Sequence, residues 1–138
     1  MDFYNQTLTI LEEIIPGETG EDILHSIGTT LFKHRFKGVY ASDEIPSMNN
    51  GDMIIVNLDK RSQPGSHWIA LAMTKSKTGK LITNIYDSYG RDLELGITNT
   101  RDTEYDAEQT ISETNCGARV LAWLWTYYRL GITTALTI

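Results

Sequence analysis

The sequence predicts a single domain with helices at both ends of the chain and a sheet in the middle. Apolar residues recur at helical spacing near both ends, whereas the central region holds short apolar runs that are typical of covered strands. The chain has 138 residues, of which 41% are hydrophobic and 22% charged, so it is long enough to bury a core of its own. We therefore expect residues 1–138 to form one globular domain.

Two helices are predicted before residue 35. The first would be capped by Asp2 and end at Pro16-Gly17. Its inner face would hold Tyr4, Leu8, Leu11 and Ile15. The second would begin at Thr19, with Asp22 three residues later in an approximate capping box. Its inner stripe would hold Ile23, Ile27 and Leu31.

Three strands are predicted in the central region. The stretch "GVYASDEIPSMNNGD" (38–52) is rich in turn formers and is expected to be a loop. The strands that follow it would be "MIIVNL" (53–58), "HWIALAM" (67–73) and "KLITNIYD" (80–87).

The last two of these strands should form a hairpin. Gly79 can supply the left-handed residue of a three-residue loop, Lys77–Gly79. That loop pairs residues whose numbers sum to about 156, so Asp87 would lie one diagonal step from the partner of His67, on the same side of the sheet. An imidazole and a carboxylate would therefore lie close together.

The remainder of the chain contains one strongly patterned element. Residues 91–102 read as polar and irregular, and a fourth strand at Glu104–Thr110 is only weakly patterned. A helix is predicted from about Cys116 to Leu130, with Gly131 ending it. Because this helix is apolar on most sides, it should be central, with the sheet packed against it.

The only cysteine, Cys116, opens this buried helix, with Asn115 as its N-cap. The helix dipole and the unpaired N–H groups there favour a thiolate, which is a nucleophile for acyl transfer. His67 could serve as its base and Asp87 could orient the imidazole. The Cys116 N–H and the amide of Gln109 could support an oxyanion.

Each of these residues also has a structural interpretation. An isolated Cys is commonly a small buried apolar residue, and an isolated His beside a Trp is more often structural. Asp87 could simply cap a turn. The nucleophile hypothesis depends on finding all four residue types at the ends of elements, with the Cys at the start of a buried helix.

At these positions the sequence resembles the adenovirus-type cysteine endopeptidases, which are related to the SUMO-deconjugating proteases. The resemblance rests on "GSHWIALA", on "YDSYG" and on the stretch from Gln109 to "NCG". It implies an α+β fold, with the nucleophile helix packed on a mainly antiparallel or mixed sheet. It also implies His67 as base, Asp87 as acid, Gln109 as oxyanion amide and Cys116 as nucleophile. Trp68, Asn115 and Gly117 are expected to contact substrate.

The resemblance further implies cleavage of viral capsid or core precursor proteins after small residues such as Gly, in the virion and the infected cell. We expect a monomer that needs no metal or cofactor and has no membrane partner. The activating DNA and disulfide-linked peptide of the adenoviral enzyme are not expected here, because the net charge is −6 and no second Cys exists. A single Cys suits a reducing compartment, and the N-terminus lacks a signal-peptide pattern.

Two alternatives remain open from the sequence. The chain could be a deconjugating isopeptidase that acts on a ubiquitin-like protein, which short peptide substrates would distinguish. It could also be a non-catalytic binding or scaffold module, although such a protein would be expected to have lost at least one of the four chemical positions.

Overall fold

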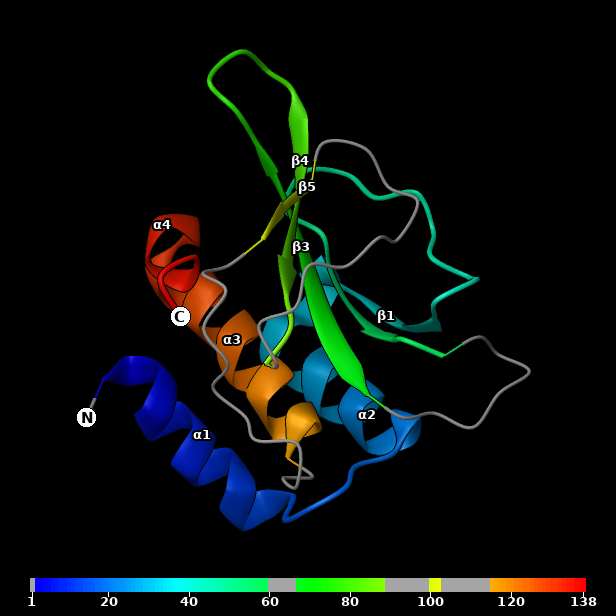
Figure 1. The fold of residues 1–138 in the computed structure, drawn as a ribbon, viewed down its shortest axis with the longest axis vertical. Coiled ribbons are helices and arrows are strands. Elements are labelled where there is room, and N and C mark those ends of the chain that lie inside the picture. The colour runs from blue at the N-terminus through cyan, green and yellow to red at the C-terminus, as the bar shows by residue number, and fades with distance from the viewer. Residues whose placement is uncertain (1, 60–66, 89–99, 103–114) are drawn as a thin grey trace.

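The structure is a computed structural model that describes residues 2–59, 67–88, 100–102 and 115–138, and these residues form an α+β fold (Figure 1). Four helices and a five-stranded mixed sheet are present in these ranges. In chain order they are α1 (Phe3–Ile14), α2 (Glu21–Phe32), β1 (Phe36–Ala41), β2 (Met53–Asn57), β3 (Trp68–Lys75), β4 (Leu81–Tyr86), β5 (Thr100–Asp102), α3 (Cys116–Leu130) and α4 (Ile132–Ala135). A short 3₁₀ turn, Lys33–Arg35, joins α2 to β1.

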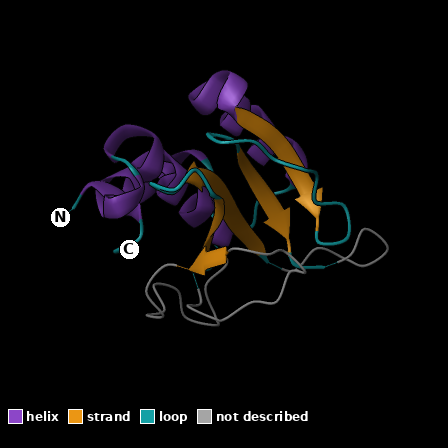
Figure 2. Ribbon diagram, turned by 90° about the horizontal axis from the view of Figure 1, so that it is seen from above, coloured by secondary structure: helices purple, strands orange, loops and turns teal. Residues whose placement is uncertain are grey.

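The strands follow the order β1-β2-β3-β4-β5 across the sheet. The two central pairs, β2 with β3 and β3 with β4, are antiparallel, whereas both outer pairs are parallel. The helices gather on one face of this sheet (Figure 2). The predicted mixed sheet is therefore confirmed, with its antiparallel part at the centre.

Both faces of the sheet are covered, which explains why the central strands read as continuous apolar runs. Alternate residues of β3, Ala70 and Ala72, join the core formed with the helices, whereas Ile69 and Leu71 face the other side. There Ile45 and Met48, from the connection between β1 and β2, pack against them. This second cover keeps the sheet from exposing an apolar face.

The first helix agrees with its prediction. The Asp2 carboxylate accepts a hydrogen bond from the Asn5 N–H at 2.8 Å and so caps α1. The residues that the spacing assigned to the inner face are all buried, namely Tyr4, Leu8, Leu11 and Ile15. Through this face α1 packs on α3.

The predicted inner stripe of the second helix is confirmed only in part: Ile27 and Leu31 are partly buried against the core, but the centre of the buried face lies one position further along the chain. The buried residues of α2 are Leu24, Gly28 and Phe32, whereas Ile23 is 50% exposed. Gly28 belongs to the inner face because the ring of Phe36 lies against it: an added Cβ would come within 2.6 Å of that ring. The helix is preceded by Gly20, without the side-chain cap expected from Thr19.

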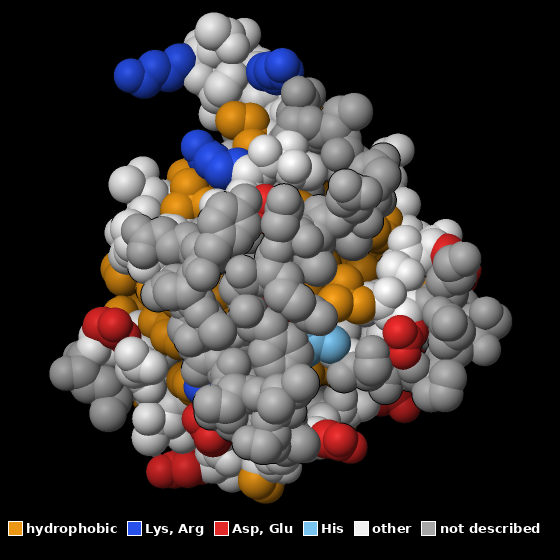
Figure 3. Space-filling view, viewed as in Figure 1, with side chains coloured by type: hydrophobic (Ala, Val, Ile, Leu, Met, Phe, Trp, Pro, Cys, Tyr) orange, Lys and Arg blue, Asp and Glu red, His pale blue; other side chains and the backbone are white. Residues whose placement is uncertain are grey.

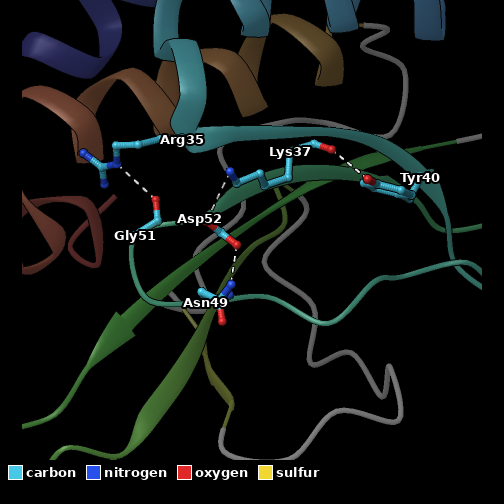
Figure 4. Close-up of polar contacts among 6 residues, drawn as sticks. All are labelled: Arg35, Lys37, Tyr40, Asn49, Gly51 and Asp52. Atoms are coloured by element: carbon cyan, nitrogen blue, oxygen red, sulfur yellow. Dashed lines mark hydrogen bonds and ion pairs between the residues drawn. The ribbon is translucent and has the colours of Figure 1, made fainter.

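The predicted loop at 38–52 begins with a strand, β1, that pairs in parallel with β2. Gly38 lies in this strand at φ +123°, close to an irregularity in the pairing, so its turn-forming character does not exclude a strand. Polar contacts hold the connection between β1 and β2 against the start of β1 (Figure 4). Asp52 accepts from the Asn49 N–H at 2.9 Å and lies 4.0 Å from the Lys37 ammonium.

The predicted hairpin and its register are confirmed. Ala70 pairs with Tyr86, and Lys75 pairs with Leu81. The Ser76 N–H donates to the Lys80 carbonyl at 2.8 Å, which closes a three-residue loop, and Gly79 has φ +84°.

The C-terminal half contains one unexpected strand and the expected central helix. The strand β5 lies in the segment that was read as irregular, whereas the predicted strand at Glu104–Thr110 lies outside the described residues. Helix α3 begins and ends where predicted, and most of its residues are buried. Gly131 follows it at φ +92°, and its N–H donates to the Tyr127 carbonyl. Within the described ranges, no helix has the length and apolar character needed to cross a bilayer.

Charge is distributed unevenly over the face seen in Figure 3. Lysine and arginine side chains gather over the tip of the β3–β4 hairpin, where Lys75, Lys77 and Lys80 are exposed. Acidic side chains lie mostly toward the helical half of the molecule. The start of β3 and the start of α3 also lie toward that half (Figure 1).

Candidate active site

Cys116 is the first residue of α3 and is partly exposed. The imidazole of His67 and the Trp68 and Gly117 backbone N–H groups lie near enough to its sulfur to lower the pKa of the thiol. A thiol at the start of a helix meets the positive end of the helix dipole as well. The sulfur therefore lies among groups that favour its negative form.

His67 and Asp87 form a buried pair. His67 comes directly before β3 and Asp87 directly after β4, so the antiparallel register brings the two together as predicted. The His67 Nε2 and Asp87 Oδ1 atoms are 2.6 Å apart, and each residue is 4% exposed. The Leu58 N–H donates to the His67 carbonyl, which fixes the backbone of His67 against the end of β2.

The side chain of Asp87 contacts one ring nitrogen of His67, Nε2, and leaves the other, Nδ1, buried and on the opposite edge of the ring. A carboxylate on one nitrogen fixes the tautomer and orientation of an imidazole, and the other nitrogen can then exchange a proton with a nearby thiol. Cys116 is near enough to His67 for each to shift the pKa of the other. The described residues thus bring a cysteine, a histidine and an aspartate together in an arrangement that could act as nucleophile, base and orienting acid.

The pKa of His67 is raised and the pKa of Cys116 is lowered, so both shifts favour an imidazolium beside a thiolate. Burial alone would lower the pKa of His67, but the hydrogen bonds with Asp87 and Cys116, and the negative charges of both, raise it above its ordinary value. Burial alone would raise the pKa of Cys116, but the hydrogen bonds with His67 and with the two backbone N–H groups lower it. A thiolate beside an imidazolium is the form that these contacts stabilise.

Trp68 and Gly117 both contact the connection between α1 and α2. The Trp68 indole donates to the Thr19 carbonyl at 3.0 Å, and an added Cβ on Gly117 would lie 3.1 Å from the Thr19 Cβ. The absence of a side chain at Gly117 therefore lets Thr19 approach the first turn of α3. The expected contact of Trp68 and Gly117 with substrate stays a prediction.

Asn115 occupies the predicted N-cap position of α3, directly before Cys116, although it does not cap the helix through its side chain. Its backbone angles are φ −99° and ψ 22°, and its side chain makes no cap hydrogen bond. Its Oδ1 atom instead accepts from the Arg119 guanidinium at 3.2 Å, one helical turn later. A ψ of 22° is not the extended backbone from which a side chain caps a helix, so the missing cap follows from the backbone itself.

Arg119 lies near this site and was not identified from the sequence. It is 9% exposed, and its Nη1 donates to the Tyr4 hydroxyl at 3.2 Å. That hydroxyl lies 2.7 Å from the Tyr86 hydroxyl. An arginine three residues after the nucleophile, on an otherwise apolar helix, was the available signal, but its partners are distant in sequence.

Gln109, the predicted oxyanion amide, lies outside the described residues, so its role stays a prediction. In the part of the chain that is described, no three His, Cys, Asp or Glu side chains are arranged to hold a metal ion. No protein family and no curated protein matches the sequence. The interpretation of the site therefore depends on its own geometry.

Proposed function

We propose that the protein is a cysteine endopeptidase with Cys116 as nucleophile, His67 as acid and base, and Asp87 as orienting acid. The observation that carries the proposal is the buried His67–Asp87 pair, 2.6 Å apart, beside a cysteine that begins the central helix. The pKa of that cysteine is lowered chiefly by His67, and the pKa of His67 is raised by Asp87 and Cys116. A structural cysteine needs no such imidazole, whereas hydrolysis through a thioester uses it.

The contacts suit each proton transfer of such a reaction. The Cys116 thiolate attacks the scissile carbonyl carbon, and the His67 imidazolium then gives its proton to the leaving amine. The neutral imidazole takes a proton from water, whose oxygen attacks the thioester and releases the acid and the thiol group. Asp87 keeps the ring in place and stabilises its charged form throughout.

We also assign the oxyanion site to the Cys116 backbone N–H and the Gln109 amide, as the resemblance implies. A donor at the first N–H of a helix is already oriented and needs no rearrangement as charge develops. Replacing Gln109 with Ala should lower the turnover number by about 10²–10³, the usual effect of removing one oxyanion donor. Unchanged turnover would remove Gln109 from this role.

The arrangement supports the finer assignment to the adenovirus-type endopeptidase fold. Histidine at the start of one strand, an acid at the end of its neighbour and cysteine opening the central helix follow the order of that family. On this proposal the substrates are viral capsid or core precursor proteins, cleaved after small residues in the virion or the infected cell.

Peptide cleavage and covalent trapping test the proposed function. Short peptides ending in Gly-Gly, fused to a fluorogenic amine, should be cleaved by the wild type and not by Cys116→Ala. A vinyl sulfone on the same peptide should add one adduct mass at Cys116. Ser76→Ala, in the exposed hairpin turn, is the control and should match the wild type.

The same assay separates the proposal from its alternatives. Cleavage of a ubiquitin-like fusion without cleavage of short peptides would indicate a deconjugase. No cleavage and no adduct with either substrate would contradict an enzymatic role.

A further inference from the structure

Thr19, in the connection between α1 and α2, contacts both elements that meet at the candidate active site. Its carbonyl accepts a hydrogen bond from the Trp68 indole at 3.0 Å, and Trp68 directly follows His67. Its side chain lies against Gly117, which directly follows Cys116: a Cβ added to that glycine would be 3.1 Å from the Thr19 Cβ. One residue thus contacts the neighbour of the proposed base and the neighbour of the proposed nucleophile.

The connection that carries Thr19 is anchored on both sides. Ile15, before it, is buried in the apolar core that includes α3. Leu24 of α2, after it, is also buried in this core, and its Cδ2 atom lies 3.3 Å from the Cβ position of Gly117. Between these anchors the connection passes the first turn of α3 (Figure 1). Because packed residues flank it, Thr19 has a fixed position from which it can restrain its two neighbours.

The hydroxyl of Thr19 does not explain why this residue is packed here. Its Oγ1 atom is buried, and it has no hydrogen-bond partner among the described residues. A buried hydroxyl without a partner is unfavourable. The contacts that Thr19 makes with the site come from its carbonyl and its Cβ, so the backbone and the shape of the side chain are the features that matter.

We propose that Thr19 is a positioning residue, which fixes the start of β3 relative to the start of α3 and so holds His67 in place beside Cys116. Its carbonyl restrains β3 through the Trp68 indole, and its Cβ sets how closely α3 approaches through Gly117. Reacting groups must be held within a fraction of an ångström of their productive geometry, and the packing around them supplies that restraint. The connection between α1 and α2 thus contributes to the site although it supplies no reacting group.

A purely structural role for Thr19 predicts something different. Loss of its contacts would then lower the stability of the fold but leave the effect of His67 on Cys116 unchanged in the folded protein. The proposal instead makes this effect depend on Thr19. The effect is measured as the iodoacetamide alkylation rate of Cys116 divided by the rate in the matching His67→Ala variant, at a pH below the wild-type midpoint. Because both rates come from the same background, a change in reagent access cancels from this His67 ratio.

The experiment measures the His67 ratio in wild type, Thr19→Gly and Trp68→Phe. Thr19→Gly removes the Cβ that lies against Gly117, and Trp68→Phe removes the indole donor but keeps an aromatic ring. Each substitution should lower the ratio about two- to tenfold, the factor that one ordinary hydrogen bond represents. An unchanged ratio in either variant would overturn the proposal.

Two controls separate shape from other effects. Thr19→Val keeps the carbonyl and the branching at Cβ and loses only the hydroxyl, so its His67 ratio should match that of the wild type. A decrease as large as that of Thr19→Gly would assign the effect to the hydroxyl and overturn the proposal. Trp125→Phe makes the same ring substitution on α3, away from the connection, and should also leave the ratio unchanged.

A further variant covers a failure to fold. If circular dichroism shows that Thr19→Gly is unfolded, Gly117→Ala replaces it, because the new methyl group would press on the Thr19 Cβ from the other side of the same contact. The His67 ratio should again decrease, and an unchanged ratio would contradict the proposal.

This inference rests on the proposed function, because it treats His67 as the base of Cys116. The two fail in distinguishable ways. If His67→Ala leaves alkylation of the otherwise wild-type protein unchanged, the proposed catalytic pair is wrong and the role of Thr19 is wrong with it. If His67→Ala slows alkylation by the same factor in wild type, Thr19→Gly and Trp68→Phe, only the role of Thr19 is wrong.

Discussion

At the scale of single residues, the site depends on the buried pair His67–Asp87 and on the partly exposed Cys116 beside it. His67 and Asp87 are almost fully buried, so their hydrogen bond forms away from water, where it has its largest effect. Burial opposes both shifts, but the pKa of His67 is raised by Asp87 and then by Cys116, and the pKa of Cys116 is lowered chiefly by His67.

The pH profile of peptide cleavage should therefore be bell-shaped. The rate rises as pH increases through the lowered pKa of Cys116, because the thiolate forms there. It falls as pH increases through the raised pKa of His67, because the imidazolium that protonates the leaving amine is lost. A profile of kcat/KM against pH checks this, and a rate that keeps rising above the pKa of an ordinary thiol would contradict it.

Replacing Asp87 with Asn should narrow that profile from both sides. The carboxylate raises the pKa of His67, so its loss moves the alkaline limb to lower pH, and the weaker imidazolium moves the acidic limb to higher pH. Maximal cleavage should also fall, because a neutral amide stabilises the imidazolium less well than a carboxylate. The comparison is made at constant ionic strength, and an unchanged alkaline limb would show that Asp87 does not act on His67.

The residues of the site differ in how well the sequence could predict them. His67, Asp87 and Cys116 lie at the ends of strongly patterned elements, so their positions followed from local patterns and one hairpin register. The side-chain contact of Asn115 did not, because its Oδ1 accepts from Arg119, which also donates to Tyr4 near the opposite end of the chain. A capping preference read from neighbouring residues takes no account of Tyr4, which lies 115 positions before Arg119 in the sequence.

At the scale of elements, the structure was predictable where apolar residues alone decide the packing. The β3–β4 hairpin and α3 have clear patterns and clear glycine boundaries, and both agree with the prediction. The face of α2 and the strand β1 were missed because glycines take part in them. Gly28 is a packing position for Phe36, and Gly38 lies inside a strand, whereas both residues read from the sequence as weak or turn-forming positions.

Gly28→Ala should therefore destabilise the protein, although alanine is the better helix former by about 1 kcal/mol. The new methyl group would overlap the Phe36 ring, and such overpacking typically costs about 1–3 kcal/mol. Ser26→Ala, on the exposed face of the same helix, should change stability by less than about 0.5 kcal/mol. Urea unfolding followed by circular dichroism measures both, and a Gly28→Ala protein as stable as the control would refute the close contact.

At the scale of the whole molecule, α1 belongs to the same core as α3, the helix that Cys116 begins. Its buried face packs with α3 in the larger apolar cluster, and the Tyr4 hydroxyl accepts a hydrogen bond from Arg119 of α3. The first helix and the last helices of the chain are thus parts of one core.

Leu8→Ala tests this connection. The side chain is 5% exposed, and its truncation should lower the free energy of unfolding by about 2–5 kcal/mol. Ile10→Ala on the opposite face, where the side chain is 60% exposed, should change it little. Tryptophan fluorescence and far-ultraviolet circular dichroism should report a single coincident transition for both variants. Separate transitions would contradict one cooperative domain.

The central claim is that Cys116 is a nucleophile activated by His67, and the pH dependence of Cys116 alkylation in wild type and His67→Ala tests it most directly. As the only cysteine, Cys116 gives the entire signal. The account predicts rapid alkylation of the wild type with a midpoint well below that of a free thiol, about 8.5, and a midpoint that rises in the variant. Slow alkylation with the same midpoint in both proteins would contradict it, and Cys116 would then be a structural residue.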